Sequence, residues 1–207
     1  MSNVGLLYVG AVLFINGLML IGKVPGKSAA IINFFVGTMQ VVFPTIIIAQ
    51  SGGDPATILG ASGLYLFGFT YLYVALNQMF GLPGEGLGWF SLFVAACAVT
   101  YGAISFTVSN DPVFGVVWII WAVLWFLFFL LLALGKDSLT ETTGWFTIIV
   151  AHLTATIPAL LLLSGTFVST PANAVVMAVG GIAALAIAWF LGRRASVQRE
   201  SAAAAHA

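Results

Sequence analysis

The chain has 207 residues, of which 61% are hydrophobic and 6% are charged, with six Lys/Arg balanced by six Asp/Glu. Because roughly a quarter of the residues of a soluble domain carry charge, this composition excludes an ordinary soluble domain and is typical of a polytopic membrane protein. The zero net charge also excludes the strongly basic surface that a nucleic-acid-binding protein needs. A single cysteine, Cys97, excludes an internal disulfide and a thiolate metal cluster.

Seven charge-free stretches are long enough to cross a bilayer, whose apolar core of about 30 Å needs about 20 helical residues. They cover residues 4–22, 29–49, 57–79, 87–108, 113–134, 145–164 and 172–191. Each is continuously apolar rather than alternating, which favours helices over a β-barrel. The longest connection, 135–144, has only ten residues. The sequence therefore predicts an all-α polytopic membrane protein with seven transmembrane helices in a single domain, residues 1–192.

The basic residues indicate how the helices are oriented. When the connections are numbered alternately, all six fall on one side of the membrane: Lys23, Lys27, Lys136, Arg193, Arg194 and Arg199. The positive-inside rule makes that side the cytoplasm, so we expect the N-terminus outside and the C-terminus inside. The low-complexity tail, residues 193–207, is then cytoplasmic and is predicted to be disordered. The first span lacks the preceding basic residues of a signal peptide and is expected to stay in the mature protein.

The predicted spans contain no Asp, Glu, Lys or Arg, which disfavours an ion-coupled pump. A retinal protein is excluded because the seventh span has no lysine. No cofactor, metal site or enzymatic activity is expected, because these spans offer no paired histidines, carboxylate dyad or activated nucleophile. The lone intramembrane histidine, His152, has three open interpretations: a hydrogen-bonded packing residue, a pore-lining donor or a pH switch.

Aromatic and leucine side chains recur at helical spacing within the spans. They are Trp118, Trp121 and Trp125 at i, i+3 and i+7, Phe67 and Tyr71 at i and i+4, and Leu6 and Leu13 seven residues apart. Such stripes are typical of packing faces or of interfacial belts, but a belt lies near helix ends. Trp121 and Trp125 fall near the middle of their span, so a pore lining is an alternative.

Six ordered sequence blocks resemble one known family. They are LLYVG (6–10), NFFVG (33–37), FGFTYLYVALN (67–77), WFSLFVA (89–95), WIIWAVLW (118–125) and LTATIPALLL (153–162). Together they resemble the AmiS/UreI family of bacterial urea and short-chain amide channels. The resemblance implies six helices and one pore per protomer, a homo-hexameric ring in the cytoplasmic (inner) membrane, and passive conduction of urea or small amides to a cytoplasmic urease or amidase.

The resemblance also implies which residues line the pore. The family's constrictions correspond to the stripe residues, and His152 is an eighth candidate; the stripe residues are Leu6, Leu13, Phe67, Tyr71, Trp118, Trp121 and Trp125. Flat aromatic walls suit a small planar solute, and indole N–H and tyrosine O–H groups are expected to offset part of its desolvation. A lining without fixed charge is expected to exclude ions.

Three features depart from the acid-gated urea channel that typifies the family. Val150 stands at the position of an acidic pore residue, and it is open whether His152 replaces it. The connection SGGDPAT (51–57) has no histidine, whereas the relative has a histidine-rich outer loop, so we expect little acid activation. The seventh span lies beyond the six-helix pattern, as in the amidase-associated branch, and its small residues predict close packing around the ring: Ala172, Gly180, Gly181, Ala183 and Ala184.

Two rival functions remain beside a passive channel. A proton-coupled transporter of the same solutes would use His152 as its titrating group. A non-transporting membrane scaffold for an amidase or urease would leave the aromatic stripe unexplained. Urea and short aliphatic amides stand as equal candidates for the permeant. Both are neutral and planar, and the extra space that an amide's methyl group needs could be provided by any residue of the pore wall.

Overall fold

A computed structural model describes residues 2–205, with side chains as far as residue 195. The described chain contains seven helices long and apolar enough to span a membrane and no strand, which confirms the predicted all-α class. The spans are α1 (Ser2–Leu20), α2 (Gly26–Gln50), α3 (Pro55–Phe80), α4 (Glu85–Thr107), α5 (Pro112–Leu132), a composite sixth span (Asp137–Leu163) and α8 (Pro171–Ala205).

Aspartate caps begin two of the helices that carry the predicted stripe. Asp54 precedes α3, and its Oδ2 accepts hydrogen bonds from the Thr57 backbone N–H at 2.8 Å and the Thr57 hydroxyl at 2.6 Å. Asp111 precedes α5, and its Oδ1 accepts from the Phe114 N–H at 3.0 Å. A proline follows each cap, at the position where its missing N–H costs nothing.

The sixth span is longer and less regular than predicted. It consists of a 3-10 turn (Asp137–Leu139), α6 (Thr140–Val150), a π-helix, η2 (Ala151–Thr156), and α7 (Ile157–Leu163). Residues 137–144 are therefore helical rather than part of a ten-residue connection. Glu141 lies in the first turn of α6 and is 8% exposed, so the expectation of spans without ionisable residues is wrong here. The positive end of a helix favours a carboxylate in that turn.

The helix α8 also extends beyond its predicted end at residue 191, as far as Ala205. The segment 193–205 is thus helical rather than disordered, in agreement with the high helix propensity of its alanines. Residues 206 and 207 lie outside the described part of the chain. The expectation of a disordered tail is therefore not met over residues 193–205.

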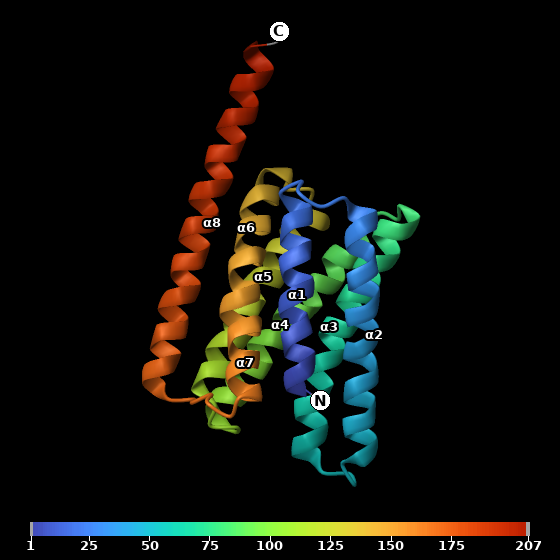
Figure 1. The fold of residues 1–207 in the computed structure, drawn as a ribbon, viewed down its shortest axis with the longest axis vertical. Helices are drawn as coiled ribbons and strands as arrows, with labels where there is room; N and C mark the ends of the chain where they lie inside the picture. Colours follow the sequence, from blue (N-terminus) through green and yellow to red (C-terminus); the bar gives the residue numbers. More distant parts are fainter. Residues whose placement is uncertain (1, 206–207) are drawn as a thin grey trace.

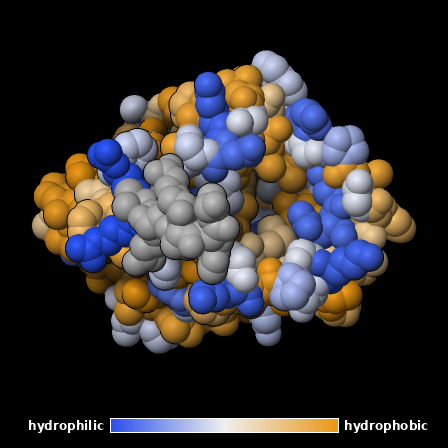
Figure 2. Space-filling view, turned by 90° about the horizontal axis from the view of Figure 1, so that it is seen from above, coloured by the Kyte–Doolittle hydropathy of each residue, from blue (hydrophilic) through white to orange (hydrophobic). Residues whose placement is uncertain are grey.

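Short connections make successive spans antiparallel, so α1, α3 and α5 run in the same direction (Figure 1). The helix α2 packs on α3 and α4 packs on α5, while α1 lies against the sixth span (Figure 1). The connections that contain Lys23 and Lys136 share one end of the bundle with the C-terminal part of α8 (Figure 1). Figure 2 looks onto that end, where hydrophilic residues gather on the face and hydrophobic residues dominate the rim.

The helix α8 covers α6 and α5 from outside and contacts them through its small residues. A Cβ added at Gly181 would lie 2.6 Å from Ile120 Cδ1, and one added at Gly192 would lie 2.8 Å from the Thr142 backbone nitrogen. Ala184 and Ala188 on the same face are buried. Of the small residues predicted to pack closely, Gly181 and Ala184 lie at this contact, which is with helices of the same protomer, whereas Ala172 and Ala183 are exposed.

Candidate pore

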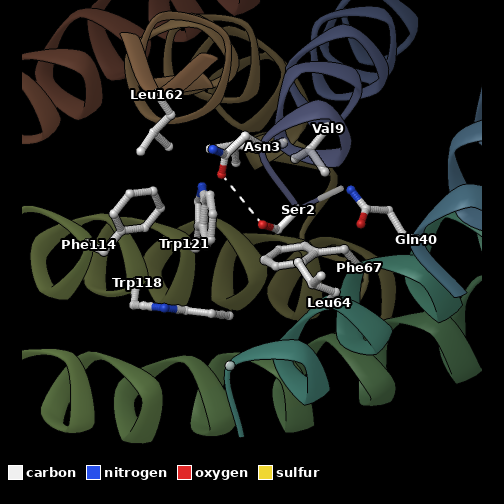
Figure 3. A pocket seen from close by; sticks show the side chains of 12 residues that line it. Ser2, Asn3, Val9, Gln40, Leu64, Phe67, Phe114, Trp118, Trp121 and Leu162 are labelled. Carbon is white, nitrogen blue, oxygen red and sulfur yellow. Dashed lines mark hydrogen bonds between the residues drawn. The ribbon is translucent and has the colours of Figure 1, made fainter. Parts of the chain in front are cut away.

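Two cavities lie one after the other along the parallel helices α1, α3 and α5. The cavity at the N-terminal halves of these helices, which we call the outer cavity for its place at the N-terminal end of the bundle, has a volume of about 240 Å³ (Figure 3). Its lining includes Asn3, Leu6, Gln40, Phe67, Trp118 and Trp121. The inner cavity, at their C-terminal halves, has a volume of about 30 Å³, which exceeds the roughly 10–15 Å³ that a cavity needs to hold one water. Its lining includes Leu13, Asn16, Thr70, Tyr71, Ser91 and Trp125.

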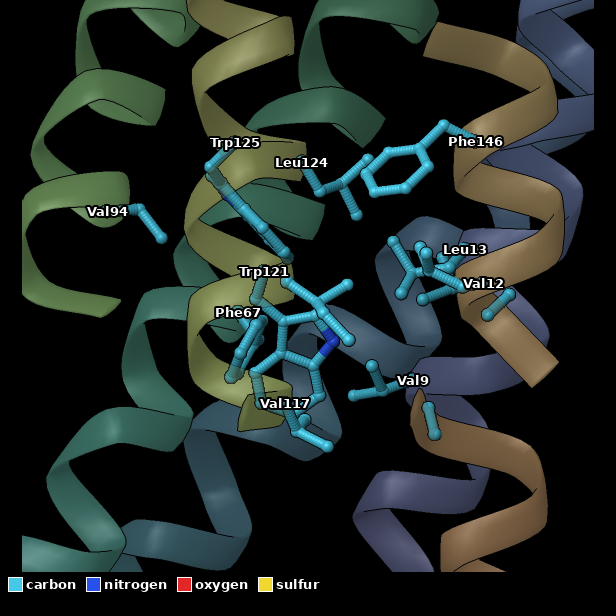
Figure 4. Close-up of a cluster of buried hydrophobic side chains, with 14 of the residues drawn as sticks. Val9, Val12, Leu13, Phe67, Val94, Val117, Trp121, Leu124, Trp125 and Phe146 are labelled. Atoms are coloured by element: carbon cyan, nitrogen blue, oxygen red, sulfur yellow. The ribbon is translucent and has the colours of Figure 1, made fainter. Parts of the chain in front are cut away.

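A buried aromatic cluster separates the two cavities. The Phe67 ring centroid lies 4.8 Å from that of Trp121 on the outer side and 5.1 Å from that of Trp125 on the inner side, both in edge-to-face geometry. Val9 and Leu13 of α1 are buried opposite them in the same cluster (Figure 4). No charged side chain lines either cavity among the described residues. The constriction is therefore apolar, aromatic and uncharged.

Threonines on neighbouring helices hold the two buried indoles in place. Trp121 Nε1 donates to Thr154 Oγ1 at 2.9 Å, and Trp125 Nε1 donates to Thr70 Oγ1 at 3.3 Å. Each threonine hydroxyl in turn donates to a carbonyl of its own helix, that of Val150 or Leu66. These two indole N–H groups are therefore not free to donate to a permeant, which corrects the expectation from the sequence. Their hydrogen bonds to the threonines fix the orientation of the rings instead.

Close packing of α2 on α3 places Gln40 beside the constriction. A Cβ added at Gly68 would lie 3.0 Å from the backbone carbonyl atoms of Gln40, so a glycine is needed at this contact. The side chain of Gln40 is fully buried, and its Nε2 donates to the Gly5 carbonyl at 2.9 Å. Gly68 directly follows Phe67 in sequence, so the same close approach brings Gln40 to the floor of the outer cavity.

The inner cavity has its own buried polar groups. Asn16 and Asn33 exchange reciprocal side-chain hydrogen bonds of 3.0 and 2.6 Å between α1 and α2. Tyr71, which is 1% exposed, has a hydroxyl without a hydrogen-bond partner among the described residues. Because burying an unpaired polar group is costly, this hydroxyl calls for a partner such as a water or a ligand in the adjoining cavity.

The structure brings seven of the eight predicted residues to the two cavities. Leu6, Phe67, Trp118 and Trp121 line the outer cavity, and Leu13, Tyr71 and Trp125 line the inner one. His152 is the exception: it is exposed on the protomer surface, and its ring centroid lies 5.2 Å from that of Phe14.

Helical geometry explains the position of His152. Val150 and Thr154 are fully buried on the inward face of the sixth span. Two residues correspond to about 200° of helical rotation, so His152 points away from that face. The interpretation of His152 as a pore-lining donor is therefore corrected, and Val150 at the family's acidic position contributes an apolar side chain.

Sequence reasoning did not select the neutral polar residues of the cavities as site residues. Gln40, Thr70 and Thr154 were visible as polar residues inside apolar spans, which is the available signal. Spacing along one helix does not reveal that a threonine on α3 or η2 accepts from an indole on α5, because these pairs are 55 and 33 residues apart.

Comparisons with known proteins agree with this geometry. Residues 1–166 match the family model described as AmiS/UreI family transporter. A Rhodococcus erythropolis protein named as transporter protein AmiS2 is 59% identical over 174 residues, covering 84% of each chain. A Mycolicibacterium smegmatis protein named as a transporter of amidate substrates is 55% identical over 194 residues, covering 94% of this chain and 91% of the relative. The latter match extends into α8, because only 170 residues precede that helix.

A urea channel provides the structural comparison. The acid-activated urea channel of Helicobacter pylori is 36% identical over 190 residues, covering 78% of this chain and 97% of the relative. The electron cryomicroscopy structure of the H. pylori urea channel in a closed state superposes with a TM-score of 0.74 at 37% identity, covering 81% of this chain and all of the other. A crystal structure of that urea channel gives a TM-score of 0.73 at 38% identity.

Proposed function

The chain belongs to the AmiS/UreI family of transporters and is a multi-pass protein of the bacterial inner membrane; on this premise we propose that it is a passive channel for urea and short-chain aliphatic amides. The observation that carries the proposal is the pair of cavities in line along α1, α3 and α5, separated by an uncharged aromatic constriction. A passive pore needs such a route and no chemistry, so the protein is not an enzyme.

The shape and polarity of the constriction suit a neutral planar solute. The faces of Phe67, Trp121 and Trp125 offer flat apolar walls to such a molecule. Ions are disfavoured because no fixed charge compensates for the hydration they would lose between those walls. Hydrogen-bonding groups of the solute meet polar atoms on either side of the constriction, at Gln40 and Tyr71.

The proposal includes an orientation and an assembly. The N-terminus faces outward, because the connections that contain Lys23 and Lys136 share the opposite end of the bundle with the C-terminal part of α8, to which Arg193 belongs. Labelling of a cysteine introduced at Ser51 by a membrane-impermeant maleimide on intact cells, in a Cys97→Ala background, checks this orientation.

The protomers form a hexameric ring that supplies a cytoplasmic amidase or urease, with α8 packed at its periphery. Native mass spectrometry measures the number of protomers.

Stopped-flow light scattering on proteoliposomes tests the channel. Urea and acetamide are expected to enter rapidly and without saturation, whereas glycerol is not. Trp125→Ala is expected to change that permeability, because the indole forms the inner side of the constriction. Trp189→Ala, on the outward face of α8 where the side chain is 50% exposed, is the matched control and should behave as the unmodified chain. Permeability no greater than that of protein-free liposomes would contradict the proposal.

A further inference from the structure

The carboxamide of Gln40 is buried at the outer cavity, and its carbonyl oxygen is unpaired within the described part of the chain. Its Oε1 has no hydrogen-bond partner among the described residues, although the side chain exposes no surface. Gln40 belongs to the lining of the outer cavity, and Figure 3 shows its carboxamide end turned toward that cavity. A buried acceptor beside a cavity calls for a donor that the cavity delivers.

The hydrogen bond to α1 fixes which way the carboxamide faces. Nε2 lies 2.9 Å from the Gly5 carbonyl oxygen, and only the NH₂ group of an amide can donate there. If the amide nitrogen and oxygen were exchanged, the Gln40 oxygen would face the Gly5 carbonyl oxygen, and neither atom could donate a hydrogen bond. Oε1 is therefore held in place as the acceptor that remains available.

The neighbouring polar groups do not supply the missing donor. The indole N–H of Trp121, which lines the same cavity, is used by Thr154. The Ser2 hydroxyl at the cavity mouth donates to Asn3 Oδ1 at 3.5 Å. Next to Gln40 the lining is apolar, with Val9 and Phe67 buried on either side of it. The hydrogen that pairs with Oε1 therefore has to come from the contents of the cavity, which are water in the absence of permeant and a solute N–H group when a urea or amide replaces that water.

From these observations we infer that Gln40 forms an amide-recognition subsite, in which Oε1 accepts a hydrogen bond from the NH₂ group of a urea or primary amide before the solute enters the constriction. This inference rests on the proposed function and adds the contact that selects the permeant. Phe67 lies directly beyond the subsite, so a solute bound at Gln40 stands at the entrance to the aromatic slot.

The test compares four single substitutions in proteoliposomes, with urea and acetamide as the probes. Gln40→Met removes the acceptor at similar length and is expected to lower the permeability of both solutes by roughly three- to tenfold, the worth of one hydrogen bond. Gly5→Ala leaves the carboxamide in place but adds a methyl carbon 3.1 Å from both Oε1 and Nε2, so it displaces the group and is expected to reduce permeability in the same direction.

Two matched controls accompany these variants. Gln50→Met makes the same chemical change on the same helix, at an exposed position outside the cavity. Gly84→Ala adds the same methyl group outside both cavities, at an ordinary van der Waals distance of 3.4 Å from Leu132 Cδ2. Both are expected to conduct as the unmodified chain does. If Gln40→Met fails to assemble, Gly5→Ala carries the test.

The outcomes separate this inference from the proposed function. Unchanged conduction by Gln40→Met and Gly5→Ala, with a conducting parent chain, would overturn the subsite and leave the channel intact. Losses of equal size in the two controls would also overturn it, because the effect would then not belong to the carboxamide. A parent chain that conducts neither solute would overturn the channel and the subsite with it.

Discussion

At the scale of single residues, the pore is organised by neutral hydrogen bonds rather than by charge. Each buried indole donates to a threonine whose own proton is committed to a helix carbonyl, so the ring orientation is fixed through two consecutive bonds. This arrangement sets the angles at which the indole rings meet Phe67 at the constriction. It also makes the threonines as important to the pore as the tryptophans, although no threonine is needed to touch the permeant.

Thr154→Val is expected to lower the free energy of unfolding by about 1–3 kcal/mol, because the isosteric change leaves the buried Trp121 N–H without an acceptor. Denaturant titration in detergent micelles, followed by tryptophan fluorescence, measures the change. Thr100→Val is the control, since that hydroxyl is exposed and bonds only to its own helix at 3.3 Å. Equal stability of the two variants would argue against the anchoring role.

At the scale of helices, the site depends on two local adjustments. Glycine at position 68 lets α3 approach α2 closely enough to set Gln40 beside Phe67. The π-helix Ala151–Thr156 precedes Pro158, and its wider turn accommodates a proline that has no N–H to donate. That widened turn carries Thr154, so the irregularity lies where the sixth span contacts the pore.

Gly68→Ala is expected to destabilise the protein by about 1–3 kcal/mol through overpacking, because its new carbon would lie 2.9 Å from Val41 Cγ2 and 3.0 Å from the Gln40 backbone. Gly60→Ala on the same helix meets no atom within 4 Å and should instead stabilise the chain by about 0.5–1 kcal/mol. Thermal unfolding of both variants in the same detergent distinguishes them. A mild effect at Gly68 would mean that α2 and α3 separate easily.

At the scale of the whole molecule, the Asp, Glu, Lys and Arg residues of the described chain lie toward the ends of the spans, and the pore between them has no charged side chain in its lining. Asp54, in the connection between α2 and α3, receives hydrogen bonds from the Thr57 side chain and backbone, which hold the pKa of its carboxyl below the ordinary value of 3.8. A depressed carboxyl pKa means that the cap is present at higher pH and is lost only as the pH falls through that low value.

Amide permeability is therefore expected to change by less than about twofold between pH 7.5 and pH 5, since a carboxyl with a pKa below 3.8 stays largely ionised across this range. His152 lies outside both cavities and therefore does not line the route of the permeant. Flux into proteoliposomes buffered symmetrically at each pH measures this. A steep rise on acidification would show that a group elsewhere in the molecule controls conduction.

The sequence by itself determined the class of the protein and the number of spans, and it placed the stripe residues on shared helix faces, whereas their assignment to a pore came from the family resemblance. Hydropathy and helical spacing report which side chains share a face, and they do so without knowledge of the neighbouring helix. Spacing failed at His152 because the inward face of the sixth span had not been located, and at residues 137–144 because polar residues at a helix start resemble a loop.

Only the tertiary structure decided what the pore polar groups do. The indole–threonine pairs, the close contact at Gly68 and the unpaired Oε1 of Gln40 each join helices that are distant in sequence. Their roles depend on distances of about 3 Å between side chains. Hydropathy fixes which segments enter the membrane, whereas the meeting of particular polar atoms is fixed by how closely the helices pack.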